Sequence, residues 1–164
     1  QLLRRCLAFP GTADLEYRVV SGAYNRHLGE LRALEGQHPN VRIYSNVSDM
    51  CGLMCSCDIA ATAGGSTMYE LSAVGVPMVC FSFVDNQERI VEGFVEKGLV
   101  CFGGNYLVQG EDMTAEAEEG KLDPVIGRAL LAGDAALREA YSRKLRAVAD
   151  GCGAMRIAGR LVKD

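Results

Sequence analysis

Residues 58–77 of the chain read DIAATAGGSTMYELSAVGVP, and this stretch decides the fold class. A short apolar strand runs into a paired-glycine turn, and a helix with one carboxylate near its start follows the turn. Gly64 and Gly65 carry no side chain to hold a ligand away from the backbone, so N–H groups at the helix start can point at an anion. The helix is closed by Gly75 and broken by Pro77, and a second apolar strand begins directly afterwards.

Polar side chains complete a predicted phosphate and ribose site. Ser66 and Thr67 add hydroxyl donors, and Glu70 lies one helical turn beyond Thr67 on the same face. A carboxylate there can accept two hydrogen bonds from a vicinal diol such as a ribose. The neighbouring Tyr69 and Leu71 face the other way and are assigned to packing. An ordinary strand-to-helix turn with a dipole-stabilising Glu is the alternative, and the residues alone leave both interpretations open.

Strand and helix patterns alternate along most of the chain. Strands are predicted at 17–21, 41–44, 59–62, 78–83 and 99–102, with helices at 25–34, 48–55 and 87–97 besides the one after the glycine turn. This alternation predicts an α/β, Rossmann-like fold with a parallel sheet covered by helices on both faces. Residues 104–120 are predicted as an acidic surface loop, and residues 121–164 as C-terminal helices at 124–131, 135–148 and 153–162.

The run from the glycine turn to Pro77 resembles the donor-binding domain of glycosyltransferase-B type enzymes that use UDP-sugars. A Gly-rich turn, a Glu six residues on and an Ala-x-Gly-x-Pro helix end recur there. Two families are similar: the UDP-sugar hydrolase of pseudaminic acid synthesis with related spore-coat polysaccharide proteins, and the N-acetylglucosaminyl transferase of peptidoglycan lipid II synthesis. The first is favoured by Asp85-Asn86-Gln87 after a strand and by DGCGAMRI at 150–157. The resemblance covers roughly residues 15–162.

The resemblance implies roles for residues at the carboxyl ends of several strands, which meet at one edge of a parallel sheet. It implies that Asn46 and Val47 lie beside the uracil while Met50 packs on the ring, and that the glycine turn and Glu70 hold the diphosphate and ribose. The Asn-Gln pair after the fourth strand suits sugar hydroxyls or an acetamido group. A polar turn, core residues and helix caps are the alternatives. The predicted substrate-binding residues are Gly22, Asn46, Val47, Gly64, Gly65, Ser66, Thr67, Glu70, Asn86 and Gln87.

The resemblance also implies that part of the fold is absent. In the resembling enzymes the C-terminal half opens with a central strand before its first helix, whereas residues 1–9 here read as that helix. We therefore expect 1–164 to be a single nucleotide-sugar-binding domain, a fragment that lacks its first strand and the N-terminal domain. The resemblance assigns the catalytic base to that missing domain, so no catalytic residue is predicted here. The strands 18–21 and 59–62 would then be bridged by a second copy of the chain or would pair directly.

The amino-acid composition limits which partners and cofactors we expect for the chain. The net charge is −4, which favours no nucleic-acid partner. Seven cysteines without a Cys-x-x-Cys pair are typical of reduced, packed thiols, so we predict no disulfide framework, no metal and no cofactor. The sequence has no charged-then-apolar leader and no apolar run approaching 18 residues, which predicts a cytoplasmic protein without a membrane span.

Three functions are consistent with these features. The first is the UDP-sugar-binding half of a nucleotide-sugar hydrolase in surface-polysaccharide or nonulosonic-acid biosynthesis. The second is the donor domain of a UDP-sugar glycosyltransferase. The third belongs to another class, a non-catalytic nucleotide-binding or interaction module. A dinucleotide oxidoreductase is disfavoured because no G-x-G-x-x-G follows the first strand.

Overall fold

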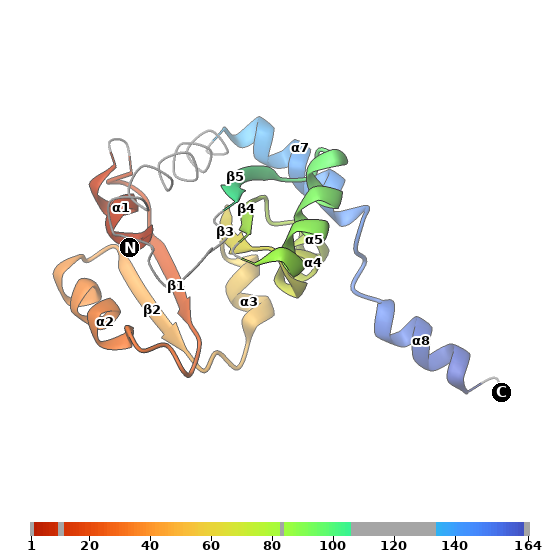
Figure 1. The fold of residues 1–164 in the computed structure, drawn as a ribbon, viewed down its shortest axis with the longest axis horizontal. Helices are drawn as coiled ribbons and strands as arrows, with labels where there is room; N and C mark the ends of the chain where they lie inside the picture. The colour runs from red at the N-terminus through yellow and green to blue at the C-terminus, as the bar shows by residue number, and fades with distance from the viewer. Residues whose placement is uncertain (1, 10–11, 83, 106–133, 163–164) are drawn as a thin grey trace.

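The chain folds into parallel strands flanked by helices, which confirms the predicted α/β class (Figure 1). The computed structural model describes residues 2–9, 12–82, 84–105 and 134–162. The strands are β1 (Tyr17–Ser21), β2 (Val41–Ser45), β3 (Ala60–Ala63), β4 (Met78–Ser82) and β5 (Cys101–Asn105). The helices are α1 (Leu2–Ala8), α2 (Leu28–Gln37), α3 (Met50–Cys55), α4 (Ser66–Val74), α5 (Asp85–Glu96), α7 (Ala135–Arg146) and α8 (Gly153–Leu161).

One predicted segment falls largely outside this description. The acidic loop expected at 104–120 gives its first two residues to β5, and the rest lies outside the described residues. The helix expected at 124–131 lies outside them entirely. The two later helices are present as α7 and α8, each ending slightly earlier than predicted.

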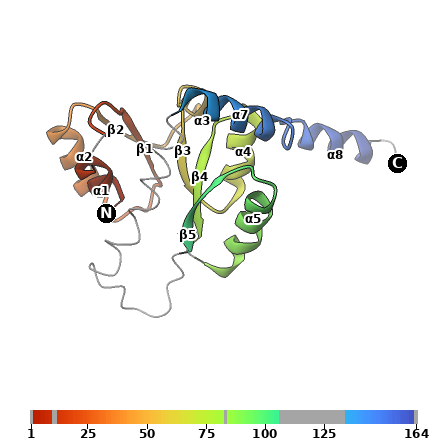
Figure 2. The same cartoon turned by 90° about the horizontal axis from the view of Figure 1, so that it is seen from above.

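The strands form two separate sheets. One contains β1 and β2, and the other has the order β3-β4-β5, with every pair parallel. Figures 1 and 2 show β1 on the side of the first sheet that faces β3, but the two strands are not hydrogen-bonded neighbours. The expectation that the strands at 18–21 and 59–62 pair directly is therefore wrong for this structure.

The core of the larger sheet surrounds β4, which is buried along its whole length. Met78 and Cys80 belong to a cluster with residues of α4, α5 and α7. Val79 and Phe81 alternate with them and therefore face the other side of the sheet. There they pack against Leu2 of α1 among others. A strand that is apolar on both faces is typical of the interior of a parallel sheet.

The smaller sheet has its own core. Leu3 of α1, with Val41 and Ile43 of β2, is buried there, and three leucines of α2 pack against them. Helix α1 therefore contributes to both cores, through Leu3 on one side and Leu2 on the other. This helix is a packing link between the two sheets.

Several helix starts differ from the predicted ones because other residues cap them. Asp49 caps α3 by accepting a hydrogen bond at 2.8 Å from the Gly52 N–H, so this helix begins at Met50 and not at 48 as predicted. Helix α5 begins at Asp85, and its N-cap Val84 has no capping side chain. The side chains that follow β4 at 85–87 therefore belong to the first turn of the helix and are not its caps.

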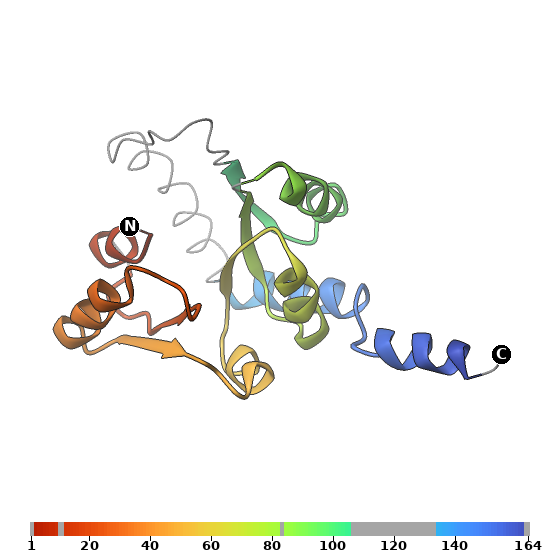
Figure 3. The same ribbon diagram turned by 60° about the horizontal axis from the view of Figure 1, so that its bottom comes forward.

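Helix α8 leads away from both sheets, as Figure 3 shows. Its apolar side chains are exposed, including Met155 at 71% and Leu161 at 74%. No helix within the described parts of the chain is both long and apolar enough to cross a membrane.

All seven cysteines are free thiols. Cys51 and Cys55 are exposed on α3, so the prediction of packed thiols is wrong for this pair. Cys80 follows the prediction, because it is fully buried in β4. Its burial raises the pKa of the thiol to about 12.

Candidate functional site

The predicted glycine turn joins β3 to α4, and its two glycines have different surroundings. Gly64 is buried, and its N–H donates to the Phe81 carbonyl at 2.8 Å. A Cβ at Gly64 would lie 2.6 Å from Cγ2 of Val91 and 3.0 Å from the backbone oxygen of Gln87. Position 64 therefore needs glycine for close packing of β3 against α5, a role that the sequence did not predict.

Gly65, unlike Gly64, has open space around its Cβ position. Its backbone is extended, with φ −179° and ψ −167°, and a Cβ there would meet no atom within 4 Å. Gly65 is the N-cap of α4 but supplies no capping side chain. The N–H groups of Ser66 and Thr67 lie in the first turn of α4, where amides have no partner within the helix. Open space and helix N-terminal amides are the features that an anion needs.

The first turns of α4 present a polar face. Ser66 and Glu70 are exposed and Thr67 is half-buried, so their side chains are accessible beside the turn. Leu71 packs in the core as predicted and is 3% exposed, whereas Tyr69 is 48% exposed, although its ring meets Phe94 edge-on with 5.2 Å between ring centroids. Glu70 is therefore free of the core and available to a ligand.

The start of α5 lies against the same turn. The Cβ of Gln87 is 3.0 Å from the position that a Gly64 Cβ would take. Asn86 is exposed and Gln87 is half-buried in the first turn of α5. The structure thus brings the backbone of α5 at Gln87 against the glycine turn.

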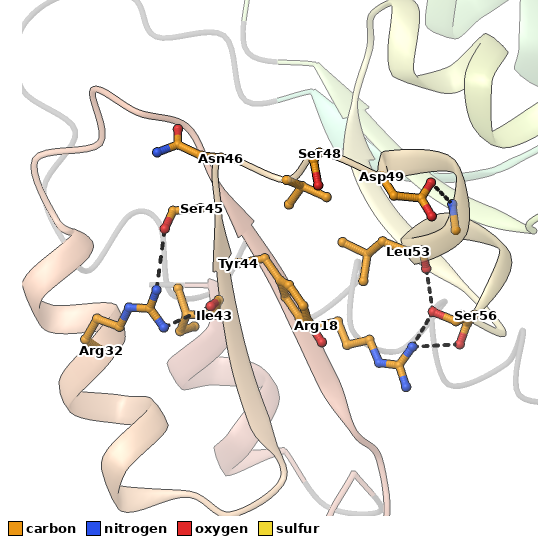
Figure 4. Close-up of a pocket in the computed structure, with 12 residues that line it drawn as sticks. Arg18, Arg32, Ile43, Tyr44, Ser45, Asn46, Ser48, Asp49, Leu53 and Ser56 are labelled. Atoms are coloured by element: carbon orange, nitrogen blue, oxygen red, sulfur yellow. Dashed lines mark hydrogen bonds between the residues drawn. The ribbon is translucent and has the colours of Figure 1, made fainter.

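A cavity of about 620 Å³ lies elsewhere, between β2 and α3 (Figure 4). The hollow is wide open, whereas sites for small molecules bury most of the ligand surface. Tyr44 and Leu53 lie on opposite sides of it. The lining residues are Arg18, Arg32, Ile43, Tyr44, Ser45, Asn46, Val47, Ser48, Asp49, Gly52, Leu53 and Ser56.

Two predicted base-binding residues line this cavity. Asn46 is exposed with φ 53°, a left-handed conformation that Asn tolerates better than most residues, and Val47 is half-buried. Met50, which the resemblance places on the ring, does not line the cavity. The predicted Asn46-Val47 turn is therefore in a hollow, whereas its predicted methionine is not.

Two arginines that line the cavity donate hydrogen bonds to backbone carbonyls. Arg18 Nη1 donates to the Ser56 carbonyl at 3.1 Å and also to the Ser56 hydroxyl. Arg32 Nη1 donates to the Ile43 carbonyl at 2.9 Å and to Glu35 at 2.7 Å. The Ile43 N–H donates to Glu35, and this bond, followed by the contact with Arg32, lowers the pKa of that carboxyl. Both guanidinium groups therefore have structural partners.

The predicted site is divided between the two sheets. None of the residues of the glycine turn, α4 or α5 lines the cavity that contains Asn46 and Val47. Gly22 is exposed just beyond β1 and does not line the cavity that contains Asn46 and Val47. Sequence reasoning missed Arg18 and Arg32, because only the fold places their partners beside them. Within the described residues, no three His, Cys, Asp or Glu side chains are grouped closely enough to hold a metal ion.

Relatives were found by sequence. No family model matches the chain. The chain is 30% identical over 102 residues to the spore coat polysaccharide biosynthesis protein SpsG of Bacillus subtilis (strain 168). This alignment covers 60% of this chain and 30% of SpsG. The chain is also 28% identical over 87 residues to the uncharacterized protein MJ1062 of Methanocaldococcus jannaschii. This alignment covers 51% of this chain and 18% of MJ1062. The chain thus spans less than a third of the length of either relative.

A solved structure is also similar. Spinosyn forosaminyltransferase SpnP aligns with a TM-score of 0.45 at 19% identity, over 91% of this chain and 44% of SpnP.

Proposed function

We propose that the chain is the UDP-sugar-binding half of an enzyme of surface-polysaccharide or nonulosonic-acid biosynthesis. The observation that carries the proposal is the turn at Gly65, where a Cβ would meet no atom within 4 Å at the start of α4, with Glu70 exposed one turn beyond Thr67. Sequence similarity to SpsG, a protein of spore coat polysaccharide biosynthesis, supports this class of pathway.

In this proposal the ligand is held at its diphosphate and its ribose. The amides of Ser66 and Thr67 and their hydroxyls bind the diphosphate, and the Glu70 carboxylate accepts from the ribose diol. The amide side chains of Asn86 and Gln87, in the first turn of α5, bind the sugar. Asn46 and Val47 bind the uracil in the cavity next to α3.

A nucleotide-sugar hydrolase is favoured over a UDP-sugar glycosyltransferase, because Asp85-Asn86-Gln87 and the 150–157 segment resemble the hydrolase family more closely. The catalytic base is expected in an N-terminal domain of the complete protein. This chain alone is therefore expected to bind UDP weakly and to turn nothing over, since only part of the ligand would be desolvated. A non-catalytic nucleotide-binding module is the alternative of another class.

The test is a titration with UDP followed by amide resonances. Shifts at residues 64–70 are expected, and Glu70→Ala should weaken binding by about 1.5–3 kcal/mol, roughly 10- to 150-fold. The control is Glu92→Ala, which removes an exposed carboxylate from α5. It should bind UDP as the parent does.

A titration with 2′,3′-dideoxy-UDP distinguishes a lost ribose contact from a general effect of Glu70→Ala on folding. Without the 2′ and 3′ hydroxyls, the ligand should bind the parent and Glu70→Ala equally. A Glu70→Ala protein that still prefers UDP to dideoxy-UDP as strongly as the parent would remove Glu70 from the site. Release of UDP from a UDP-sugar by a longer protein that contains the N-terminal domain would favour the hydrolase, and transfer of the sugar to an acceptor would favour the transferase.

A further inference from the structure

Helix α3 carries sulfur atoms along one face. Residues 50–57 read MCGLMCSC, and the helix covers the first six of them. Side chains three or four positions apart are neighbours on a helix, so Cys51 lies beside Cys55. Met54 is three positions from Cys51 and four from Met50, so the two methionines continue the same face. We predicted no metal because the sequence has no Cys-x-x-Cys pair, but on a helix a spacing of four residues also brings two thiols together.

The sulfur-bearing face is separate from the cavity. The residues of α3 that line the cavity are Gly52 and Leu53, and Figure 4 shows Leu53 directed toward it. Cys51 and Cys55 are not among the lining residues, and both thiols are exposed. A ligand can therefore reach the two thiols from solvent without entering the cavity.

The two thiols are in contact with each other. A hydrogen bond between the Cys51 and Cys55 side chains raises the pKa of Cys51. Cβ atoms four positions apart on a helix are separated by about 5–6 Å, whereas a disulfide needs about 3.5–4.5 Å. The pair therefore cannot close into a disulfide while α3 stays helical. The two sulfur atoms can, however, converge on a single ion held between them.

The donors at this place are soft. The Met54 thioether belongs to a flexible, unbranched side chain that is half-buried and packs against the core of the larger sheet. The Asp49 carboxylate is already engaged as the cap of α3, where it accepts from the Gly52 N–H. Thiolate and thioether ligands select Cu(I), whereas hard cations prefer oxygen.

Zinc fits the pair less well than Cu(I). Structural zinc sites hold the ion with four protein ligands in a tetrahedron, and catalytic ones with three. In the part of the chain that the structure describes, no third His, Cys, Asp or Glu joins the two cysteines. Cu(I) is stable with two thiolates, or with two thiolates and a thioether, so the donors on α3 are sufficient for it.

We propose that Cys51 and Cys55, with the thioether of Met54 beside them, form a binding site for one Cu(I) ion. Each thiol releases its proton to solvent as its sulfur binds, so two S–H bonds break and two S–Cu bonds form. The copper stays Cu(I), and no electrons are exchanged. None of the residues proposed to bind the nucleotide takes part, so this site goes beyond the proposed function and does not depend on it.

The test is a competition for Cu(I) itself. The 164-residue chain is titrated without oxygen against a coloured chelator of Cu(I), and the loss of colour counts the ions that the protein takes. The parent should bind one ion at this pair. Cys51→Ser and Cys55→Ser should each weaken binding by about 100-fold or more, because the remaining thiolate loses the high effective concentration of its neighbour. Met54→Leu keeps the side-chain volume and should weaken binding by about 10-fold.

Cys57→Ser is the matched control. Cys57 belongs to the same sequence run, but it is half-buried and its Sγ donates to the Leu53 carbonyl at 3.3 Å. Its removal should leave the affinity for Cu(I) unchanged. Cys51→Ala and Cys55→Ala repeat the loss of each thiol without a hydroxyl group. Since both positions are exposed, these variants should keep the helical circular dichroism of the parent.

Four results would overturn the proposal. An equal loss of affinity in Cys57→Ser would mean that any thiol of the chain binds the ion. Parent-like affinity in a protein with both Cys51→Ser and Cys55→Ser would place the copper elsewhere. Parent-like affinity in Met54→Leu would contradict the site with three donors. Displacement of Cu(I) by an equal amount of Zn²⁺ would mean that the donors do not select a soft ion.

Discussion

Alanine at Gly64 is expected to destabilise the fold through a steric clash. Its Cβ would lie 2.6 Å from Cγ2 of Val91 and 3.0 Å from both Cβ and the carbonyl oxygen of Gln87. Val91 is 3% exposed, so it has little room to move, and the Gln87 oxygen belongs to the backbone of α5. Overpacking of this kind costs about 1–3 kcal/mol. For a domain of this size, that corresponds to a melting temperature lower by about 2–12 °C.

The neighbouring glycine is a matched control. A Cβ at Gly65 meets no atom within 4 Å, and its extended backbone suits any residue. Alanine there restricts the unfolded chain but is less favourable than glycine at a helix N-cap, so the two effects oppose each other and the melting temperature should change little. The added methyl group would occupy the open space beside the helix N-terminus, so UDP should bind more weakly. One substitution thus affects mainly folding, and the other affects mainly binding.

Thermal melts and UDP titrations of the two variants check this reasoning. It is refuted if Gly64→Ala melts at the temperature of the parent, or if Gly65→Ala lowers that temperature more than Gly64→Ala does. If Gly65→Ala folds well and binds UDP as tightly as the parent, the turn is a structural connection and not a phosphate site.

Two further predictions concern ionisable groups. At pH 8 a thiol reagent should modify Cys51 and Cys55 while the protein is folded, and Cys80, with its pKa near 12, only after unfolding; mass spectrometry of the labelled peptides measures this. The Asp150 carboxylate pairs with Arg156 at 2.5 Å and accepts from Cys152 N–H, which lowers its pKa to about 2. Its stabilisation of the start of α8 is therefore complete above the unfolded pKa of roughly 3.9 and is lost as the pH falls through about 2. Amide shifts of α8 should follow that titration, and in Asp150→Asn they should not; equal pH dependence in both proteins would contradict the assignment.

The strands and the glycine turn could be predicted because local sequence determines them. Apolar runs between turn residues placed the ends of every strand within three residues of the observed ones, and the Gly64-Gly65 pair marked the end of β3. Helix starts were less accurate. Helix α2 begins three residues later than predicted, because Asn25 forms a local turn in which its side chain accepts from the His27 N–H at 2.9 Å. Such a side-chain bond competes with the helix and is invisible to periodicity.

The site could be predicted only in part, because its surroundings come from distant parts of the chain. The need for glycine at 64 arises from Val91, and the cavity wall at Arg18 is held by Ser56, 38 residues away. The sequence indicated which residues are chemically suited to a nucleotide. It did not indicate that Asn46 and the glycine turn would lie on different sheets, because strand pairing across β1 and β3 cannot be read from local pattern.

The division of the site has a consequence for affinity. The residues proposed to bind the base follow β2 of the β1-β2 sheet, and those proposed to bind the diphosphate follow β3 of the β3-β4-β5 sheet. A nucleotide that contacts residues on both sheets can bind only those molecules in which the two sheets are at one particular separation. If only a fraction of molecules has that separation, the apparent affinity falls by the same fraction.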